Sequence, residues 1–389
     1  MSSGGRRRLP TWSARNGGEA RAVISAGRVY RARPMIPLAS ERRGGSRQGA
    51  EVMKRRQLIQ RAAALGGAAA AAPLIAACGP AATAPSASPA ASAAATATAK
   101  PIRTLKVGYI PLTDFLGMYA AIEQGYIADE GLKLELQAMS GGAAIIPAIT
   151  GGSLDFGISN YVSTILSNAQ GLKIKVFSDS AYDSKDHSPF SVVVKKGSPV
   201  KAAKDLNGKK IAVNTRNNIV HVGVMEWMEQ KGGDPKTAQF VELPFPQMPA
   251  ALTQGQVDAI APTEPFVTVS TSQDGQILAN YFAEIRDNVA IAGFISTEDW
   301  INKNRDVAQA FHRANTKGMD FVAKNEKTAR DYVVKYANLD PALAGKVNLS
   351  ALRSTPLLDS VQFWVDMSKK WGLLDKSSTL KAEDLFVKF

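Results

Sequence analysis

Cysteine and histidine are scarce in this sequence, which limits the metal and covalent chemistry it can support. Cys78 is the only cysteine in 389 residues, so the chain can form no internal disulfide, and no other thiol is present for catalysis or a zinc site. The three histidines share no metal-ligand spacing. No P-loop, G-x-S-x-G or G-x-G-x-x-G motif occurs either. We therefore expect no enzyme activity, no cofactor and no metal.

Most of the chain also lacks an excess of positive charge, although the formal net charge of the whole sequence is +13. Residues 1–52 contain eleven Arg and three Glu, and residues 53–77 contain four basic side chains and no acidic one. Residues 78–389 hold 32 basic and 31 acidic side chains. A nearly neutral body offers no electrostatic attraction to nucleic acid or to an acidic membrane surface. We predict that nucleic acid is not a partner.

The most apolar run near the start of the chain is too short for a conventional membrane span. Residues 62–77 are about 16 weakly hydrophobic residues, mostly Ala, against the roughly 20 that a spanning helix requires. They follow Met53-Lys54-Arg55-Arg56 and precede Cys78, so the segment resembles a twin-arginine export signal joined to a lipoprotein cleavage box. We predict a signal peptide over 53–77 and lipidation of Cys78.

Two segments flank this signal. Residues 1–52 have no apolar periodicity, and we expect them to be disordered or not translated, with Met53 as the start. Residues 79–100 consist almost entirely of Ala, Pro, Ser and Thr, which cannot bury enough apolar surface to fold. We therefore predict a lipid-anchored flexible tether over 78–103.

One motif occurs twice, and it organises the rest of the chain. The copies are residues 148–157 and 251–260, in which Gly152 matches Gly255 and Asp155 matches Asp258. Each copy has the pattern of a helix end, a Gly in the left-handed conformation and an Asp turn leading into a short apolar strand. Two such joints indicate two domains of similar architecture that together form a cleft.

From residue 104 the chain alternates strands and helices, as in open α/β sheets. In the first domain we expect strands at 105–110, 132–136, 156–159 and 174–178, and helices beginning at Phe115, Ser140 and Asn160. In the second we expect strands at 190–194, 211–213, 240–243 and 259–261, and helices at 201–206, 220–230 and 249–254. A strand at 289–295 returns to the first domain, and helices follow at 305–325, 327–336, 356–371 and 381–389.

These elements predict two lobes joined by a two-strand hinge. Lobe I comprises residues 104–189 and 295–389, and lobe II comprises residues 190–294. The two crossings are expected near Ser188-Pro189 and near Gly293.

A ligand of an open α/β sheet lies at the carboxyl ends of strands, where loops become helix N-termini. Five loops fall there: residues 111–115, 140–143, 159–161, 214–218 and 262–265. The free N–H groups of a helix N-terminus favour an anion or a hydrogen-bond acceptor. Ordinary helix capping by Ser, Thr and Asn explains the same residue types.

Six short segments are informative because of the order in which they occur: 107–111 (VGYIP), 123–126 (EQGY), 130–132 (EGL), 152–157 (GSLDFG), 205–213 (DLNGKKIAV) and 255–259 (GQVDA). Behind a lipoprotein signal, they resemble the substrate-binding lipoproteins of ABC importers of the nitrate, sulfonate, taurine and thiamine-precursor group. The resemblance runs from about residue 104 to 389. It implies a type II periplasmic-binding-protein fold, two open α/β domains that close on one small solute and present it to a permease.

The ligand loops of that family fall on the loops named above. The resemblance therefore places ligand contacts at Thr113, Asp114, Phe115, Gly141, Gly142, Asn160, Tyr161, Thr215, Arg216, His221 and Glu264. The charge of the solute stays open at this point. Arg216 and the helix N-termini suit an anion, whereas the carboxylates of Asp114 and Glu264 would repel one. Phe115 and Tyr161 are suited to stacking on a planar ring, or to packing in the core.

We therefore expect a monomeric, extracytoplasmic, lipid-anchored protein that is not an enzyme. It would capture a small polar organic or anionic solute, such as a sulfonate, nitrate or a pyrimidine, and deliver it to an ABC permease. One alternative is a ligand-binding sensor that acts on a signalling partner. Another is an enzyme of the pyrimidine-synthase-like branch, which is marked by a cysteine-rich run that this sequence lacks.

Overall fold

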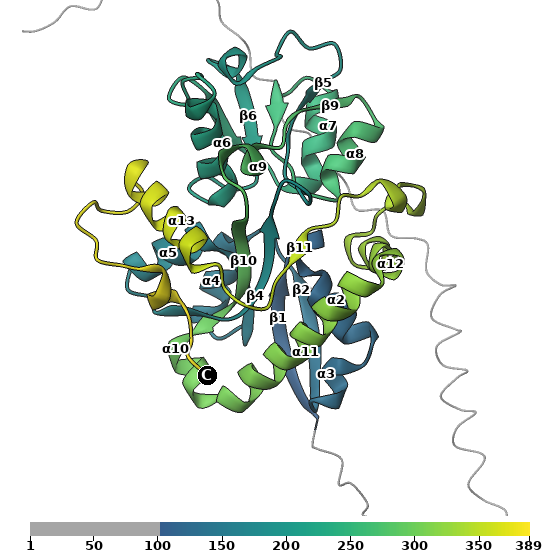
Figure 1. Cartoon of the computed structure of the whole chain (residues 1–389), viewed down its shortest axis with the longest axis vertical. Coiled ribbons are helices and arrows are strands. Elements are labelled where there is room, and N and C mark those ends of the chain that lie inside the picture. Colours follow the sequence, from purple (N-terminus) through teal and green to yellow (C-terminus); the bar gives the residue numbers. More distant parts are fainter. Residues whose placement is uncertain (1–101) are drawn as a thin grey trace, which may run out of the picture. The chain divides into compact units, whose positions relative to one another are not determined.

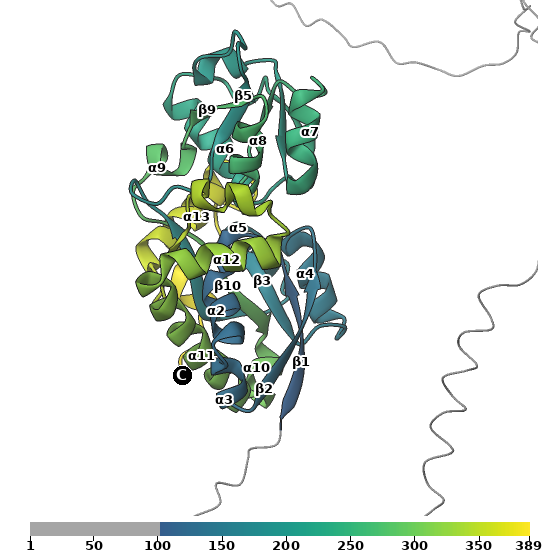
Figure 2. The same cartoon turned by 90° about the vertical axis from the view of Figure 1, so that its right-hand side faces the viewer.

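The computed structural model describes residues 102–389, which fold around two β-sheets (Figure 1). Cys78, the expected signal peptide and most of the expected tether lie outside the described residues. We use lobe I for the part of the chain around the six-stranded sheet and lobe II for the part around the five-stranded sheet; Figure 2 shows both from the side. Within residues 102–389, no helix combines the length and the apolar character that crossing a membrane requires.

The sheet of lobe I is mixed, with strand order β11-β4-β10-β3-β1-β2. Its strands are β1 (Arg103–Tyr109), β2 (Leu132–Ala138), β3 (Phe156–Asn160), β4 (Ile174–Asp183), β10 (Val289–Thr297) and β11 (Ala351–Leu352). β1 runs parallel to β2 and β3, whereas β10 is antiparallel to β3 and β4. β3 and β10 are buried along almost their whole length, as expected when helices cover both faces of a sheet.

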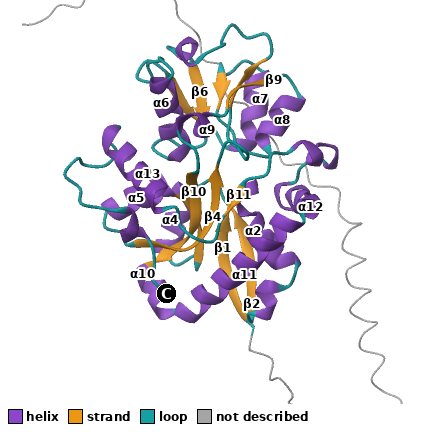
Figure 3. Cartoon of the chain, viewed as in Figure 1, coloured by secondary structure: helices purple, strands orange, loops and turns teal. Residues whose placement is uncertain are grey.

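Helices cover this sheet on both faces, with α4 and α5 on one and α2 and α11 on the other (Figures 1 and 3). The α-helices of lobe I are α2 (Leu116–Glu123), α3 (Tyr126–Asp129), α4 (Gly142–Thr150), α5 (Tyr161–Ala169), α10 (Glu298–Lys303), α11 (Arg305–Lys324), α12 (Glu326–Ala337) and α13 (Leu358–Lys370). Short 3₁₀ helices are η1 (Thr113–Phe115), η4 (Pro341–Lys346) and η5 (Ala382–Leu385). α2 and α11 approach so closely that a Cβ at Gly318 would lie 2.0 Å from the carbonyl oxygen of Gly117. The missing side chain of Gly318 therefore permits this contact.

Lobe II repeats this plan on a smaller scale, with strand order β7-β6-β8-β5-β9. Its strands are β5 (Val192–Lys195), β6 (Lys210–Val213), β7 (Gln239–Glu242), β8 (Ala259–Ile260) and β9 (Gly275–Ala279). Its helices are α6 (Ile219–Gln230), α7 (Met248–Thr253), α8 (Phe266–Ser272), α9 (Tyr281–Ile285), η2 (Ala203–Leu206) and η3 (Phe245–Gln247). β6 is parallel to β7 and β8, and β5 is antiparallel to β8, so the pairing matches that of β1, β2, β3 and β10.

The repeated motif forms the same joint in each lobe. Gly152 and Gly255 have φ of 74° and 69°, which glycine adopts without steric cost. Asp155 Oδ2 accepts a hydrogen bond from the N–H of Lys106 at 2.7 Å, and Asp258 Oδ2 accepts one from Lys210 at 2.8 Å. Asp155 thus binds the middle of the neighbouring parallel strand β1, and Asp258 binds the first residue of β6. The predicted correspondence of the two motifs is confirmed.

The chain passes between the lobes at residues 184–191 and again at 286–288. The first connection contains the crossing expected near Ser188-Pro189. The second differs from the expectation, because Gly293 lies inside β10, opposite Ser159 and Asp179 of lobe I. A Cβ at Gly293 would lie 2.7 Å from Val176 Cγ1, so this glycine reflects close packing within the sheet and does not mark a crossing.

The pattern also misplaced one helix and missed several short elements. The expected helix over 381–389 is wrong: only η5 is helical, and Phe386 then pairs with Val176 at the end of the sheet. The N–H of Val387 thus donates a hydrogen bond to the carbonyl oxygen of Val176 instead of to a carbonyl of its own helix. The sequence pattern did not indicate α8, α9, α10 or β9, which contain five to seven residues each and show little periodicity.

Candidate functional site

A small cavity lies between the two lobes, where β1, β3 and β6 end and α4, α5 and α6 begin. Its lining residues are Ile110, Leu112, Asp114, Phe115, Gly141, Gly142, Ile158, Asn160, Phe190, Asn214, Asn218, Ile219, Val220, Phe245, Ile291 and Ala292. The cavity volume is about 30 Å³, the share of a single water molecule in the liquid. Pockets for organic ligands typically measure roughly 300–1,000 Å³. A solute therefore requires the lobes to separate from this closed arrangement.

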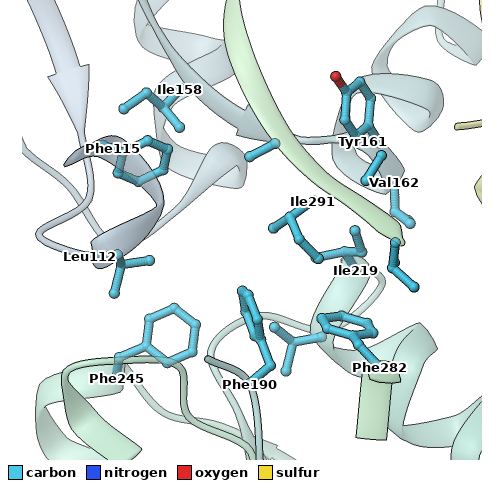
Figure 4. Close-up of a cluster of buried hydrophobic side chains, with 14 of the residues drawn as sticks. Leu112, Phe115, Ile158, Tyr161, Val162, Phe190, Ile219, Phe245, Phe282 and Ile291 are labelled. Atoms are coloured by element: carbon cyan, nitrogen blue, oxygen red, sulfur yellow. The ribbon is translucent and has the colours of Figure 1, made fainter. Parts of the chain in front are cut away.

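Most of the cavity wall is apolar. Leu112, Phe115 and Ile158 of lobe I lie opposite Phe245 and Ile219 of lobe II (Figure 4). Phe190, from the first connection between the lobes, lies on the same side as Phe245 (Figure 4). Aromatic rings on opposing walls are suited to the faces of a planar molecule.

A larger hollow adjoins this cavity. It has a volume of about 270 Å³ and shares Ile110 and Phe245 with the cavity. Pro111 and Met139 of lobe I and Pro244 of lobe II are among its other lining residues. Because loops of both lobes form its rim, separation of the lobes would join the two spaces.

Asn160 connects two helix N-termini across the cleft. Its Oδ1 accepts a hydrogen bond from the N–H of Ser163, at 2.9 Å, and so caps its own helix α5. The same oxygen accepts a hydrogen bond from the N–H of Ile219, at 3.3 Å, in the first turn of α6 in lobe II. Asn218 caps α6 by accepting from the N–H of His221 at 3.1 Å. First-turn N–H groups have no partner within a helix, and here Asn160 and Asn218 bind three of them and so fix both helix ends beside the cavity.

Asp114 is the charged side chain of the cavity wall, and it is held by a chain of hydroxyl groups. Ser350 Oγ donates to Asp114 Oδ1 at 2.6 Å. Because that bond uses the Ser350 proton, Thr113 Oγ1 must donate to Ser350 Oγ at 2.7 Å. Burial raises the pKa of Asp114 to about 6, and the Ser350 hydrogen bond partly offsets this.

Five of the eleven predicted contact residues line the cavity: Asp114, Phe115, Gly141, Gly142 and Asn160. Thr215 lies just beside the cavity, since a Cβ added at Gly141 would lie 3.7 Å from Thr215 Oγ1. Thr113 does not line the cavity; it supports Asp114 through its hydrogen bond to Ser350.

Three other predicted residues have their polar groups elsewhere. The hydroxyl of Tyr161 points away from the cavity side chains and donates to Asp179 Oδ1 at 2.6 Å (Figure 4). The side chain of Arg216 is exposed, outside the cavity wall. His221 Nδ1 accepts a hydrogen bond from the N–H of Asn217, and burial with the nearby Arg216 charge lowers the pKa of His221 to about 4. His221 is therefore neutral at pH 7.

Glu264 is buried beside the hinge and is also absent from the cavity wall. Its carboxylate accepts hydrogen bonds from the N–H and hydroxyl of Thr268, at 3.0 and 2.9 Å, and from the N–H of Asn348 at 3.1 Å. Its carbonyl oxygen accepts from the N–H of Thr113 of lobe I at 3.4 Å. Glu264 thus links α8 of lobe II to lobe I and to the segment before β11.

Four of the five loops selected from the sequence contribute to the cavity wall, but several residues beside the cavity were not among the predicted contacts. Asn218 carried a usable signal, because Asn before an apolar run is a common N-cap. Ser350 and Phe190 carried none, since they come from segments far from the repeated motifs. Only the fold brings Ser350, the residue before β11, to Asp114 in η1.

Solved structures share this architecture. The alkanesulfonate-binding protein SsuA from Xanthomonas axonopodis pv. citri, bound to MOPS, matches with a TM-score of 0.63 at 16% identity, over 75% of this chain and 100% of that one. The periplasmic nitrate-binding protein NrtA from Synechocystis PCC 6803 matches with a TM-score of 0.65 at 15% identity, over 73% and 86%. The expected periplasmic-binding-protein fold is confirmed. In this fold the interlobe cavity lies between two α/β lobes.

Sequence comparison shows the family to which the chain belongs. Residues 112–329 match the NMT1/THI5 like family, and the chain belongs to that family. The riboflavin-binding protein RibY of Chloroflexus aurantiacus is 25% identical over 310 residues, 77% of this chain and 84% of RibY. A formylaminopyrimidine-binding protein of Halalkalibacterium halodurans is 24% identical over 219 residues, 54% and 63% of the two chains.

Proposed function

We propose that this protein captures one small solute between its lobes and delivers it to an ABC permease. The observation that carries the proposal is the cavity at the carboxyl ends of β1, β3 and β6, whose wall comes from both lobes. Contacts from both lobes exist together only in the closed form, so binding shifts the equilibrium between open and closed forms. The similarity to RibY and to the alkanesulfonate- and nitrate-binding proteins named above supports this function.

We also propose that the activity is binding without catalysis. The relatives named above are binding proteins, and the cavity wall contains neither histidine nor cysteine. Within residues 102–389, no group of three or more His, Cys, Asp or Glu side chains is placed to hold a metal ion.

The proposed location is extracytoplasmic, with a lipid on Cys78. The support is the order of twin arginines, a short apolar run and a lipoprotein box before Cys78. A monomer on such an anchor reaches a permease in the same membrane. Mass spectrometry of the purified membrane-associated form tests this, and an unmodified Cys78 at the mature N-terminus would contradict the anchor.

For ligand contacts we propose Asp114, Phe115, Gly141, Gly142 and Asn160, with Thr215 beside them. Thr113, Tyr161, His221 and Glu264 then support these residues from behind, and Arg216 remains at the rim.

Gly141 allows a direct test of capture by closure. A Cβ at this position would meet Asn214 Nδ2 at 3.4 Å and Thr215 Oγ1 at 3.7 Å, both in lobe II. The variant Gly141→Leu should therefore prevent closure without disturbing the core of either lobe. Gly345→Leu is the matched control, because a Cβ at Gly345 meets nothing within 4 Å.

The test begins with a thermal-shift screen of the purified chain against sulfonates, nitrate, pyrimidines, flavins and amino-acid derivatives. A solute that binds only the folded protein raises Tm saturably. We expect Gly141→Leu to lose this rise and Gly345→Leu to retain it. Equal binding by both variants would rule out capture in this cleft.

A further inference from the structure

Asp114 gives the cavity a negative wall with no compensating cation. Among the described residues that line the cavity, Asp114 has the sole ionisable side chain. No Lys, Arg or His is among them. The titratable groups near it are Asp183 of β4, Tyr119 of α2 and Tyr281 of α9. All three are buried, and none can carry positive charge. An anion in this cavity would meet Asp114 without a neutralising partner.

The Asp114 carboxylate also has unused hydrogen-bonding capacity. The side chain is 2% exposed, and its Oδ1 accepts from Ser350 Oγ. Its Oδ2 has no hydrogen-bond partner within residues 102–389. Because Asp114 lines the cavity, Oδ2 is an open acceptor to which a donor on a bound solute can bind.

Besides Asp114, the cavity offers N–H donors and aromatic rings that a solute must match. The first turn of α4, beginning at Gly142, has no side-chain cap among the described residues and supplies N–H donors. In the first turn of α6 the N–H groups of Ile219 and His221 already bind Asn160 and Asn218, so within this part of the chain the N–H of Val220 is the donor left there. These donors alone would suit an oxyanion or a carbonyl oxygen equally. Asp114 distinguishes the two, because it repels the oxyanion and accepts from an N–H group. Phe115 and Phe245 provide the apolar surface for a ring.

We propose that the solute is a non-anionic ring compound that donates an N–H group to Asp114, and that Asp114 excludes oxyanions such as sulfonates and nitrate. This inference rests on the proposed capture of a solute in the cleft. Carbonyl or ring acceptors of the same molecule face the N-termini of α4 and α6.

The experiment measures binding to the full chain by isothermal titration calorimetry. The donor probes are riboflavin and an aminopyrimidine, the oxyanion probes are ethanesulfonate and nitrate, and riboflavin methylated at its ring imide nitrogen is the donor-free match. The key variant is Asp114→Asn, which keeps the size of the side chain and an acceptor for Ser350. Asp129→Asn, at the exposed end of α3, is the control.

We expect a donor probe to bind the wild type and the Asp129→Asn control equally, and the oxyanions not to bind. Asp114→Asn should weaken the donor probe by roughly 10- to 100-fold, the usual effect of losing a hydrogen bond to a charged group. If riboflavin is the probe that binds, methylation of its imide should cause a similar loss. Wild-type affinity should also fall below about pH 6, since burial raises the pKa of Asp114 to about 6, and this fall should be absent in Asp114→Asn.

Two results would overturn the inference while leaving solute capture intact. One is saturable binding of an oxyanion by the wild type, and the other is unchanged affinity of a donor probe in Asp114→Asn. If neither these probes nor any solute of the thermal-shift screen binds folded wild-type protein, the proposed capture function itself is contradicted, and the inference falls with it.

Discussion

Asn160 Oδ1 lies 3.3 Å from the backbone nitrogen of Ile219 and accepts its hydrogen bond across the cleft. The same oxygen accepts from the N–H of Ser163 within lobe I. One side chain therefore terminates α5 in lobe I and contributes to the first turn of α6 in lobe II. Separation of the lobes breaks only the second of these bonds, so Asn160 belongs to the closed form.

Asn160→Ser should separate these two roles. Serine retains the N-cap of α5, but its side chain is one atom shorter and cannot span to Ile219. We expect Tm to change little and the ratio of closed to open form to fall about 2- to 12-fold, as for loss of a net 0.5–1.5 kcal/mol. Small-angle X-ray scattering measures the shift as an increase in the radius of gyration.

The control for this variant is Thr297→Ala. Thr297 caps α10 by accepting from the N–H of Trp300 at 3.1 Å, within lobe I. Its loss should lower stability by about 1 kcal/mol and leave the scattering curve unchanged. A scattering curve of Asn160→Ser identical to wild type would show that the bond to Ile219 does not affect closure.

Asp179 predicts how stability depends on pH. The side chain is buried, and burial raises its pKa to about 7, although Tyr161 and Ser180 donate hydrogen bonds to it. In the unfolded chain an Asp titrates near 3.9, so between about pH 4 and 7 only the unfolded state loses this proton. The contribution of the neutral carboxyl to stability is complete below pH 4 and is lost as the pH rises to about 7.

Asp179→Asn removes this dependence, because an amide does not ionise. The difference in the free energy of unfolding between variant and wild type should increase in favour of the variant from pH 4 to pH 8. The increase should be at most about 4 kcal/mol, since one pKa unit corresponds to about 1.4 kcal/mol. Urea unfolding at a series of pH values measures it. A difference that is constant over this range would show that Asp179 titrates normally.

Lys370 of α13 pairs with Glu226 of α6 and so joins the lobes on another side of α6. The distance between Lys370 Nζ and Glu226 Oε2 is 2.7 Å, and the Glu226 side chain is 5% exposed. Trp371 Nε1 and Gln230 Nε2 also donate to this carboxylate. Removing Lys370 leaves a buried negative charge with two neutral donors.

Lys370→Met should therefore lower the free energy of unfolding by about 1–3 kcal/mol. Lys303→Met is the matched control, because Lys303 and Asp299 form a 2.8 Å ion pair in which both side chains are more than 70% exposed. That change should cost about 0–1 kcal/mol. Chemical denaturation of the three proteins compares them, and equal stability of the two variants would contradict a structural role for the interlobe pair.

Much of the fold could be predicted from the sequence because its signals are local. The glycines of the repeated motif, the alternation of strands and helices and the Asp turns all depend on neighbouring residues. The second crossing was misplaced because Gly293 has the signature of a break, yet its lack of a side chain serves packing against Val176. Local sequence does not distinguish these two uses of glycine.

The site was less predictable because its residues depend on tertiary contacts. Glu264 and Tyr161 lie on loops that face the cleft, but their polar groups pair with Asn348 and Asp179. Those partners come from distant segments, so no spacing rule reveals them. The residues most easily predicted were those at helix N-termini, where a local rule and the site coincide, as for Asn160 and Gly142.

Asp155 binds Lys106 in the middle of β1 and Asp258 binds Lys210 at the start of β6, whereas the cavity lies beyond the carboxyl ends of the same strands. Structural integrity and solute recognition are thus assigned to opposite poles of each sheet. Mutations in the recognition loops can accumulate without weakening these joints. A scaffold divided in this way can be retuned toward new nutrients, by natural selection or by directed evolution, while its folding remains unchanged.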